Sequence, residues 1–136
     1  MDLIEIETKE EIICAAELEK EIMPEVLSGD ALNDYLSEIE KKIRYESEAG
    51  AEYYLVASSG PCGVVCVRNE GDVVSVEKAE ILKEKRSSVS FERIIDILLE
   101  TYDPPALRIT ALAEKTCGFC PNGYEREDNY YIKRYY

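Results

Sequence analysis

The stretch VVSVEKAEILKEKRSSVSFERIIDILL, residues 73–99, decides the fold of this chain. Residues 73–82 are rich in β-branched and aliphatic side chains and predict a strand. After a basic, serine-rich segment, apolar residues recur at the spacing of one helix face: Phe91, Ile94, Ile95, Leu98 and Leu99. Because another strand is expected at 106–112, the stretch predicts a crossover in which the helix packs on one face of the sheet.

The residues before this stretch predict two strands that pair with it. Strands are expected at 53–57 and 63–68, with turns at 58–61 and 69–72. Both connections are tight, so these strands and the one at 73–82 form an antiparallel three-stranded meander.

The N-terminal part predicts one strand and two helices. Residues 3–7 alternate in polarity as a short strand does, and Thr8 and Glu11 have capping-box spacing. Pro24 ends or kinks the helix that starts there. A second amphipathic helix follows 28–30 and carries Leu32, Tyr35, Leu36, Ile39 and Ile43 on one face.

The C-terminal part completes the order. Residues 114–122 are compatible with a short helix or a loop, and 130–135 predict a last strand. The expected class is α/β (α+β), with a mixed, mostly antiparallel sheet flanked by helices. Its order is β-α-α-β-β-β-α-β-(α)-β, and residues 1–136 form one domain.

Composition and charge exclude several classes of protein. Of 136 residues, 46% are hydrophobic and 33% charged, which indicates a globular chain. The net charge of −13 disfavours nucleic-acid binding. No apolar run reaches the length of about 20 residues that spans a bilayer, and the N-terminus lacks a signal-peptide pattern, so we expect a cytoplasmic protein without membrane contact.

The acidic residues are concentrated in one half of the chain. Residues 1–50 hold 15 acidic and 5 basic residues. This asymmetry is compatible with a solvated helical surface or with attraction of a cationic partner.

The chemistry available is limited by residue types. Histidine is absent, and the five cysteines are an odd number, so neither a histidine-based nucleophile nor a disulfide framework is expected. Cys117 and Cys120 form a CxxC, which with Cys62 and Cys66 would allow a zinc site. On a regular strand, however, Cys62 and Cys66 share a face about 13 Å apart, so buried, free cysteines are the favoured interpretation.

Three segments resemble the GNAT-type N-acetyltransferase superfamily. Residues 81–86 (ILKEKR) occupy the place of a strand end of the form V-x-P-x-x-R, and 86–91 (RSSVSF) that of the loop R/Q-x-x-G-x-G/A. Residues 119–124 (FCPNGY) resemble the late segment Y-x-x-x-G-F/Y. The resemblance is best over 52–136 and rests on element order, since Val89 and Phe91 stand where the loop has glycines.

The resemblance implies a site for acetyl-CoA at the start of the helix. A helix N-terminus offers N–H groups and positive potential to a pyrophosphate, and nearby lysines, Arg86 and serines reinforce it. The cofactor-binding residues expected are Ile81, Leu82, Lys83, Arg86, Ser87, Ser88, Val89 and Ser90.

The resemblance also implies an acid and a base. A strand glutamate deprotonates the amine in such enzymes, and Glu77, expected on the same strand face as Ile81 and opposite Glu80, is the candidate. The tyrosine that protonates the leaving thiolate falls on Phe119. Cys120, one residue further, and Tyr124 are therefore the candidate acids.

Three functions are consistent with these patterns. The first is transfer of an acetyl group to a primary amine, a cationic small molecule or peptide, by a monomer or homodimer. The second is a non-catalytic acetyltransferase-like module that binds a ligand or a protein. The third is a thiol or metal protein that uses the cysteines.

Overall fold

The computed structural model describes residues 1–22, 30–85, 91–110 and 123–135. The helices are α1 (Lys9–Ile22), α2 (Asp30–Glu48) and α3 (Phe91–Tyr102), with a short 3-10 helix, η1, at Lys83–Lys85. The strands are β1 (Asp2–Glu5), β2 (Ala51–Ala57), β3 (Pro61–Asn69), β4 (Val74–Ile81), β5 (Ala106–Thr110), β6 (Glu125–Glu127) and β7 (Tyr130–Arg134).

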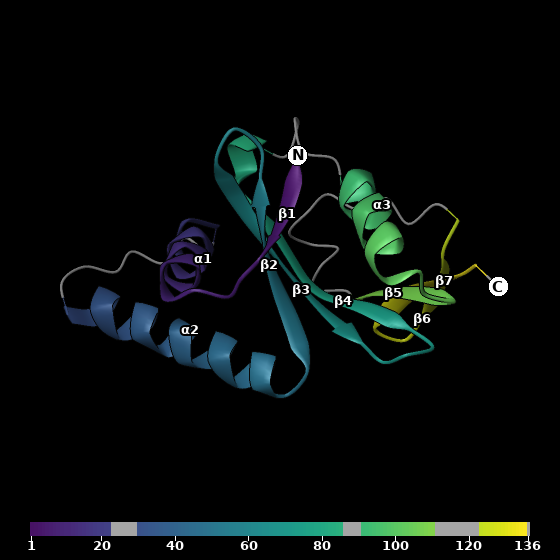
Figure 1. Cartoon of the computed structure of the whole chain (residues 1–136), viewed down its shortest axis with the longest axis horizontal. Helices are drawn as coiled ribbons and strands as arrows, with labels where there is room; N and C mark the ends of the chain where they lie inside the picture. The colour runs from purple at the N-terminus through teal and green to yellow at the C-terminus, as the bar shows by residue number, and fades with distance from the viewer. Residues whose placement is uncertain (23–29, 86–90, 111–122, 136) are drawn as a thin grey trace.

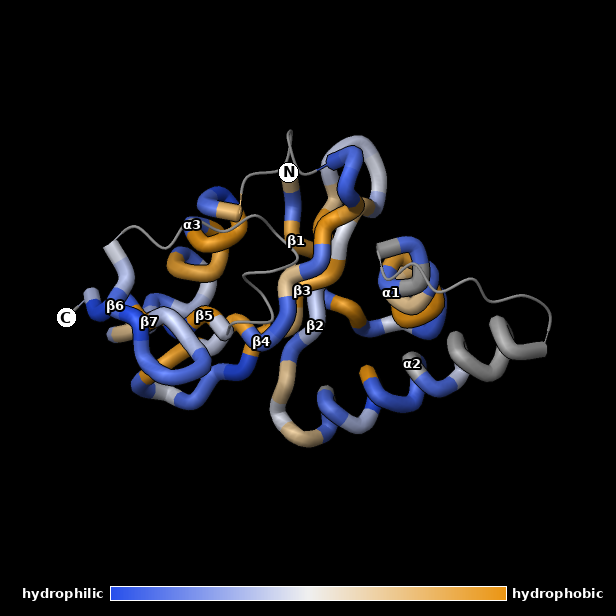
Figure 2. The backbone as a smooth tube through the Cα atoms, turned by 180° about the vertical axis from the view of Figure 1, so that it is seen from behind, coloured by the Kyte–Doolittle hydropathy of each residue, from blue (hydrophilic) through white to orange (hydrophobic). Residues whose placement is uncertain are grey.

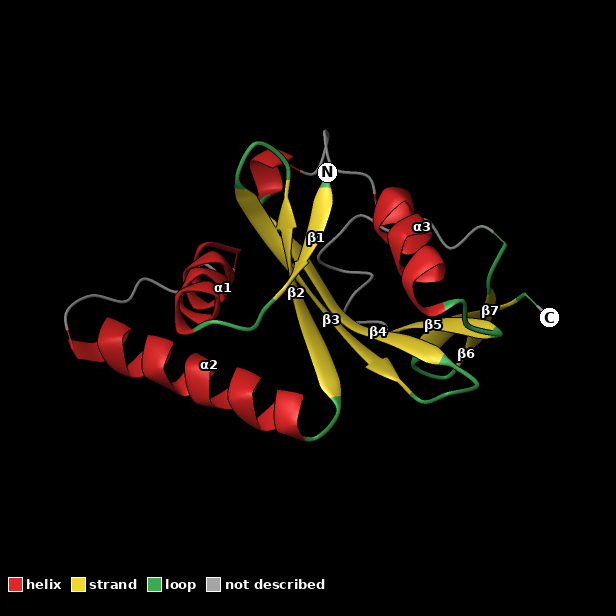
Figure 3. Cartoon of the chain, viewed as in Figure 1, coloured by secondary structure: helices red, strands yellow, loops and turns green. Residues whose placement is uncertain are grey.

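The strands described form one mixed sheet in the order β1-β2-β3-β4-β5-β7-β6. All neighbours are antiparallel except β4 and β5, which the α3 crossover joins in parallel (Figure 3). This confirms the meander, the crossover and the fold class. Strand β6 was not expected, because its sequence Glu-Arg-Glu has no apolar alternation; pairing with β7 forms it.

The helices cover the two faces of the sheet separately. Helices α1 and α2 lie on one face, and α3 lies on the other (Figure 1). The core under α3 contains Phe91, Ile94 and Leu98, packed on strand residues that include Val67 and Ile109. The core under α1 contains Ile12, Ala16, Ile43, Leu55 and Val64. We call these faces the α3 face and the α1 face.

The hydropathy of the helices differs. Helix α3 has both hydrophobic and hydrophilic residues, whereas the coloured part of α2 is mostly hydrophilic (Figure 2). No helix within the described ranges is long and apolar enough to cross a membrane.

Local signals act as the sequence predicts at the start of α1. The backbone N–H of Thr8 donates to the Glu11 carboxylate at 2.9 Å, and the N–H of Glu11 donates to the Thr8 hydroxyl at 3.2 Å. This is the expected capping box. The backbone bonds at Thr8 and Glu7 lower the pKa of Glu11, since they favour its charged form. The predicted effect of Pro24 falls outside the described residues.

The end of α3 is fixed to the sheet by a polar cluster. The Tyr54 hydroxyl donates to the Glu52 carboxylate at 2.9 Å, and Tyr102, at the last position of α3, donates to the same oxygen. This cluster ties the C-terminal end of the crossover helix to β2.

A bulge corrects one expectation about the cysteines. The register between β2 and β3 shifts between Val56 and Ala57, opposite Cys62. Cys62 therefore packs in the core of the α3 face, whereas Cys66 packs in the core of the α1 face. The prediction that they share a face is wrong, because a bulge breaks the alternation of a regular strand.

Candidate active site at the β4 bulge

A second bulge lies in the middle of β4, at Glu77. Cys66 of β3 pairs with Lys78, but its neighbour Val67 pairs with Val76, so Glu77 is the extra residue. Bulges bend a strand and are frequent beside active sites.

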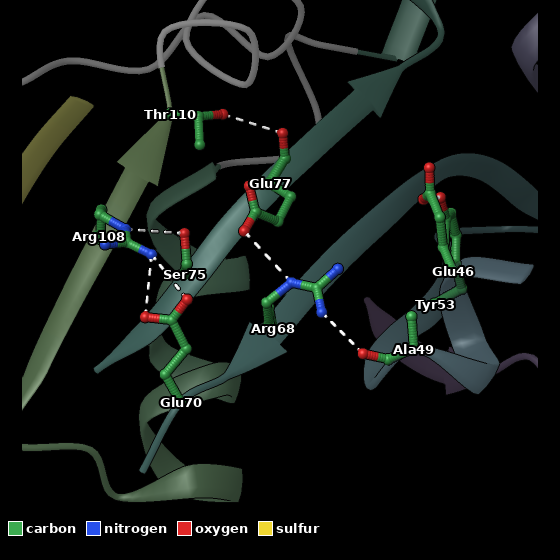
Figure 4. Close-up of polar contacts among 9 residues, drawn as sticks. All are labelled: Glu46, Ala49, Tyr53, Arg68, Glu70, Ser75, Glu77, Arg108 and Thr110. Atoms are coloured by element: carbon green, nitrogen blue, oxygen red, sulfur yellow. Dashed lines mark hydrogen bonds and ion pairs between the residues drawn. The ribbon is translucent and has the colours of Figure 1, made fainter. Parts of the chain in front are cut away.

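Strand β5 is bonded to β4 at the same bulge. The last parallel pair is Val76 with Ile109. Beyond it, the Thr110 hydroxyl donates to the carbonyl oxygen of Glu77 at 2.9 Å (Figure 4). Strand β4 continues to Ile81, whereas Thr110 is the last described residue of β5. A side-chain bond thus joins the last described residue of β5 to the bulged residue of β4.

The bulge also decides where the β4 side chains point. Val76, Ala79 and Ile81 lie in the core of the α3 face. Lys78 and Glu80 contact each other and Glu19 of α1, so they lie on the α1 face. The expectation that Glu77 shares a face with Ile81 and opposes Glu80 is wrong, because it assumed unbroken alternation.

Glu77 is a partly exposed carboxylate beside an anchored arginine. Arg68 Nε lies 3.8 Å from Glu77 Oε1, and Arg68 Nη1 donates to the carbonyl oxygen of Ala49 at 2.9 Å (Figure 4). About a third of each charged side chain is exposed, 34% for Arg68 and 35% for Glu77. Glu77 can therefore meet a solute while the guanidinium holds its orientation.

A second arginine occupies the neighbouring strand on the same face. Arg108 Nε donates to the Ser75 hydroxyl at 3.1 Å, and Nη2 donates to both carboxylate oxygens of Glu70, also at 3.1 Å. Its guanidinium carbon lies 5.2 Å from the ring centre of Tyr130. Arg68 and Arg108 were not singled out from the sequence, although a charged residue inside each of two apolar strands was a usable signal.

Under α1, three charged side chains form a buried cluster. Lys78 Nζ lies 2.7 Å from Glu19 Oε1 and 4.0 Å from Glu80 Oε1. Burial and the Glu19 charge raise the pKa of Glu80 to about 7, although Lys78 and Lys42 act against them. Burial disfavours charge on Lys78, but the carboxylates of Glu19 and Glu80 outweigh it and raise its pKa.

The expected cofactor residues that the structure describes lie at the end of β4. Ile81 is buried, and Lys83 is exposed on η1. The N–H of Leu82 donates to the carbonyl oxygen of Cys62 at 2.8 Å. Because Ile81 pairs with Gly63, this bond makes them a non-hydrogen-bonded pair, so the N–H and C=O of Ile81 point away from β3. Arg86, Ser87, Ser88, Val89 and Ser90 lie outside the described residues.

The aromatic residue at the start of α3 belongs to the core. Only 6% of Phe91 is exposed, and it packs with Ile94, Ile95 and Leu98. The Phe91 side chain is therefore buried in the core of the α3 face.

Of the two candidate acids, Cys120 lies outside the described residues. Tyr124 packs against the core of the α3 face, with Lys133 Nζ 5.8 Å from its ring centre. Burial and the neighbouring Tyr135 raise its pKa, so it keeps its proton at neutral pH. Tyr124 and Glu77 thus lie on opposite faces of the sheet.

The described cysteines show no reactive or metal-binding arrangement. Cys14, Cys62 and Cys66 are free, and no group of three or more potential metal ligands occurs among the residues whose positions are given. Burial raises the pKa of all three thiols, that of Cys66 to about 11, which keeps them protonated. Cys117 and Cys120 fall outside the described ranges.

Comparison with known proteins gives no match in sequence. No protein-family profile matches the chain, and no curated protein does.

Solved structures do resemble it. An acetyltransferase of the GNAT family from Staphylococcus aureus has a TM-score of 0.60 at 13% identity, over 98% of each chain. The PaiA N-acetyltransferase of Thermoplasma acidophilum, in complex with coenzyme A, has a TM-score of 0.55 at 16% identity, over 99% of this chain and all (100%) of the other. A spermidine N-acetyltransferase chimera from Vibrio cholerae and hSSAT has a TM-score of 0.57 at 13% identity, over 98% of this chain and 96% of the other.

These likenesses span nearly the whole chain, and they agree with the seven-stranded sheet and the crossover described above. At such low identities they establish architecture and carry no residue roles. The chain has the GNAT-type N-acetyltransferase fold.

Proposed function

We propose that this chain is one N-acetyltransferase domain, residues 1–136, that moves an acetyl group from acetyl-CoA to a primary amine. The observation that carries the proposal is the β4 bulge. It places the Glu77 carboxylate on the α1 face, partly exposed and beside Arg68. The likeness to acetyltransferases supports the same conclusion at the level of the fold.

The residues at the end of β4 fit acetyl-CoA. Ile81, the last residue of β4, and Leu82 after it are the residues that we propose to lie along the pantetheine arm. Lys83 is exposed one residue past Leu82 and would meet the phosphates. Arg86, Ser87, Ser88, Val89 and Ser90 lead into α3 and are the remaining proposed ligands. When bound, the cofactor supplies an activated acetyl thioester.

Glu77 is the proposed base. An amine attacks a carbonyl carbon only in its neutral form, so the ammonium of the acceptor must first lose a proton. Glu77 would accept this proton directly or through one water. Arg68 limits the orientations of the carboxylate because its own guanidinium is fixed to Ala49. Much of the rate would come from holding the amine in line with the thioester.

The proton for the departing thiolate has two candidate sources, Cys120 and Tyr124. Tyr124 keeps its proton at neutral pH but lies on the face opposite Glu77.

The acceptor we propose is a cationic small molecule or peptide. The first 50 residues hold 15 acidic and 5 basic residues and include α1 and α2, which cover the α1 face. Such a field attracts polycations and repels nucleic acid. The spermidine enzyme among the similar structures acts on a molecule of this kind. A cytoplasmic monomer or homodimer without membrane contact remains our expectation.

The test is to measure acetyl-CoA binding by calorimetry and then acetyl transfer to a panel of diamines, polyamines and lysine peptides. Micromolar binding and transfer to at least one cationic amine are expected. Binding without transfer to any amine, or no binding at millimolar cofactor, would contradict the proposal and favour the non-catalytic module.

A further inference from the structure

The Glu19–Lys78–Glu80 cluster has no part in the proposed transfer, and its charges do not balance. The charged side chains are exposed by only 7%, 14% and 5%, respectively. Two carboxylates and one ammonium leave a net charge of −1 when all three are ionised. An uncompensated charge in such a place is costly, so the cluster requires another positive charge or a proton.

The hydrogen bonds show which atom lacks a partner. Lys78 Nζ donates a hydrogen bond to Glu19 Oε1 at 2.7 Å, whereas Glu80 Oε1 lies 4.0 Å from the same nitrogen. Glu80 Oε2 is fully buried, and no donor among the described residues reaches it. This oxygen is therefore the place where a proton is needed.

The surrounding elements do not supply the missing charge. From α2, Lys42 lies 3.9 Å from Glu46, and Glu46 accepts a hydrogen bond from Tyr53 of β2. From β3, Cys66 contributes a neutral thiol. On β4, the Glu77 carboxylate lies beside Arg68. Among the described side chains, Lys42 is the positive charge from outside the cluster that acts on Glu80, and it pairs with Glu46.

We propose that Glu19, Lys78 and Glu80 form a site that binds one proton, and that this proton holds α1 on β4. In the protonated cluster Glu80 is neutral, Glu19 and Lys78 form an ion pair, and the buried net charge is zero. The proton comes from solvent and bonds to a Glu80 oxygen, with no other bond made or broken. Its loss leaves one buried negative charge between helix and sheet and weakens their contact.

The pH range follows from linkage. The pKa of Glu80 is about 7 in the folded protein against 4.5 in a free side chain. The folded state therefore binds the extra proton between these values, and the stability that it gives falls as pH rises through this range. Above it, both states are deprotonated and the effect is constant.

The first experiment needs no enzymatic activity. The Glu80 carboxyl is titrated by carbon-13 NMR in the full chain, and exchange protection of α1 amides is measured after correction for intrinsic rates. Protection in the wild type should fall by about tenfold per pH unit between about pH 5 and pH 7, and then level off. Glu19→Gln removes one negative charge, so the cluster is neutral without an added proton. The titration midpoint of Glu80 should then fall by at least about one pH unit, and the decrease in α1 protection between about pH 5 and pH 7 should disappear.

Two variants make the result specific. Glu17→Gln changes an exposed glutamate on α1 and should leave both measurements unchanged. Glu80→Gln should give protection that does not vary over this range; if it fails to fold, Glu19→Gln alone decides. A Glu80 titration near that of a free glutamate, or an unchanged fall in protection in Glu19→Gln, would overturn the proposal.

A second experiment rests on the proposed function. Glu80 lies on the same strand face as Glu77, three positions away, so α1 borders the proposed acceptor side. The KM for the acceptor should rise with pH in the wild type relative to Glu19→Gln, while kcat is unchanged. Absence of acetyl transfer would refute the function but leave the NMR test of the proton site intact, and a KM that changes equally in both proteins would refute the link between them.

Discussion

Glu77 and Glu80 stand on one strand and one face, yet their surroundings differ in every respect that matters for a carboxylate. Glu77 is partly exposed beside an arginine that a backbone carbonyl fixes. Glu80 is covered by α1, and one of its oxygens has no described donor. The comparison shows that burial under a helix matters more than position on the strand. An exposed carboxylate can exchange protons with a solute, whereas a buried one retains a bound proton.

The largest expected effect is on catalysis at the exposed member of the pair. Glu77→Gln removes the proposed proton acceptor while keeping the shape of the side chain. We expect kcat/KM to fall by about 100-fold or more, with acetyl-CoA affinity unchanged. Steady-state kinetics and calorimetry measure both, with Glu10→Gln, an exposed glutamate at the start of α1, as the control. If Glu77→Gln kept its turnover, Glu77 would not be the base, and the proposed difference in role between Glu77 and Glu80 would be wrong.

The next effect is on stability at the buried member. Lys78→Met removes the cation that lies between Glu19 and Glu80 and leaves two buried carboxylates. We expect a loss of about 3–5 kcal/mol in the free energy of unfolding at pH 7, and a smaller loss at pH 5, where Glu80 is protonated and carries no charge. Urea unfolding at both pH values measures this.

Lys41→Met, an exposed lysine on α2, is the control and should change little. An equal loss at both pH values would mean that Lys78 acts by packing and not by charge.

The sequence predicts the features that depend on neighbouring residues in the chain, but not those that depend on contacts between distant segments. The capping box of Thr8 and Glu11 and the crossover around 73–99 depend on neighbours in the chain, so they could be predicted. The bulge at Glu77 depends on how β3 and β4 pair, which no pattern within β4 reveals. For this reason Glu77 was placed on the wrong face.

The cofactor side shows the same division. The place of Ile81 at the end of a strand followed from its neighbours, whereas the direction of its backbone groups follows from pairing with Gly63. The Glu19–Lys78 contact joins residues of distant segments, so it too required the fold.

A third prediction probes how tightly the buried side is packed. A Cβ added at Gly63 would lie 2.5 Å from the Glu80 carbonyl oxygen and 2.6 Å from Ile81 Cδ1. Because backbone must move to admit it, Gly63→Ala should cost about 1–3 kcal/mol and weaken acetyl-CoA binding at the end of β4. Thermal unfolding and calorimetry test this. Unchanged stability would show that the backbone at this end of β4 moves at little cost. It would contradict the prediction that this end is packed more tightly than the bulge at Glu77.

The smallest effect concerns the arginine that distinguishes the exposed glutamate. Arg68 acts through Glu77: it lies 3.8 Å from the carboxylate and is itself fixed by the 2.9 Å bond to Ala49. Exposed ion pairs contribute little to stability, so Arg68→Gln should leave unfolding nearly unchanged. Loss of orientation should still lower kcat by about tenfold with KM unchanged, and Arg68→Lys should restore part of it.

Arg44→Gln removes an arginine from a surface pair with Glu40 and serves as the matched control. If Arg68→Gln were as active as this control while Glu77→Gln was inactive, the carboxylate would need no positioning partner. Exposure alone would then separate Glu77 from Glu80, and the anchored guanidinium would be only a surface ion pair. If Arg68→Gln lost activity and stability together, the arginine would instead be part of the junction between α2 and β2, since Ala49 lies between these elements.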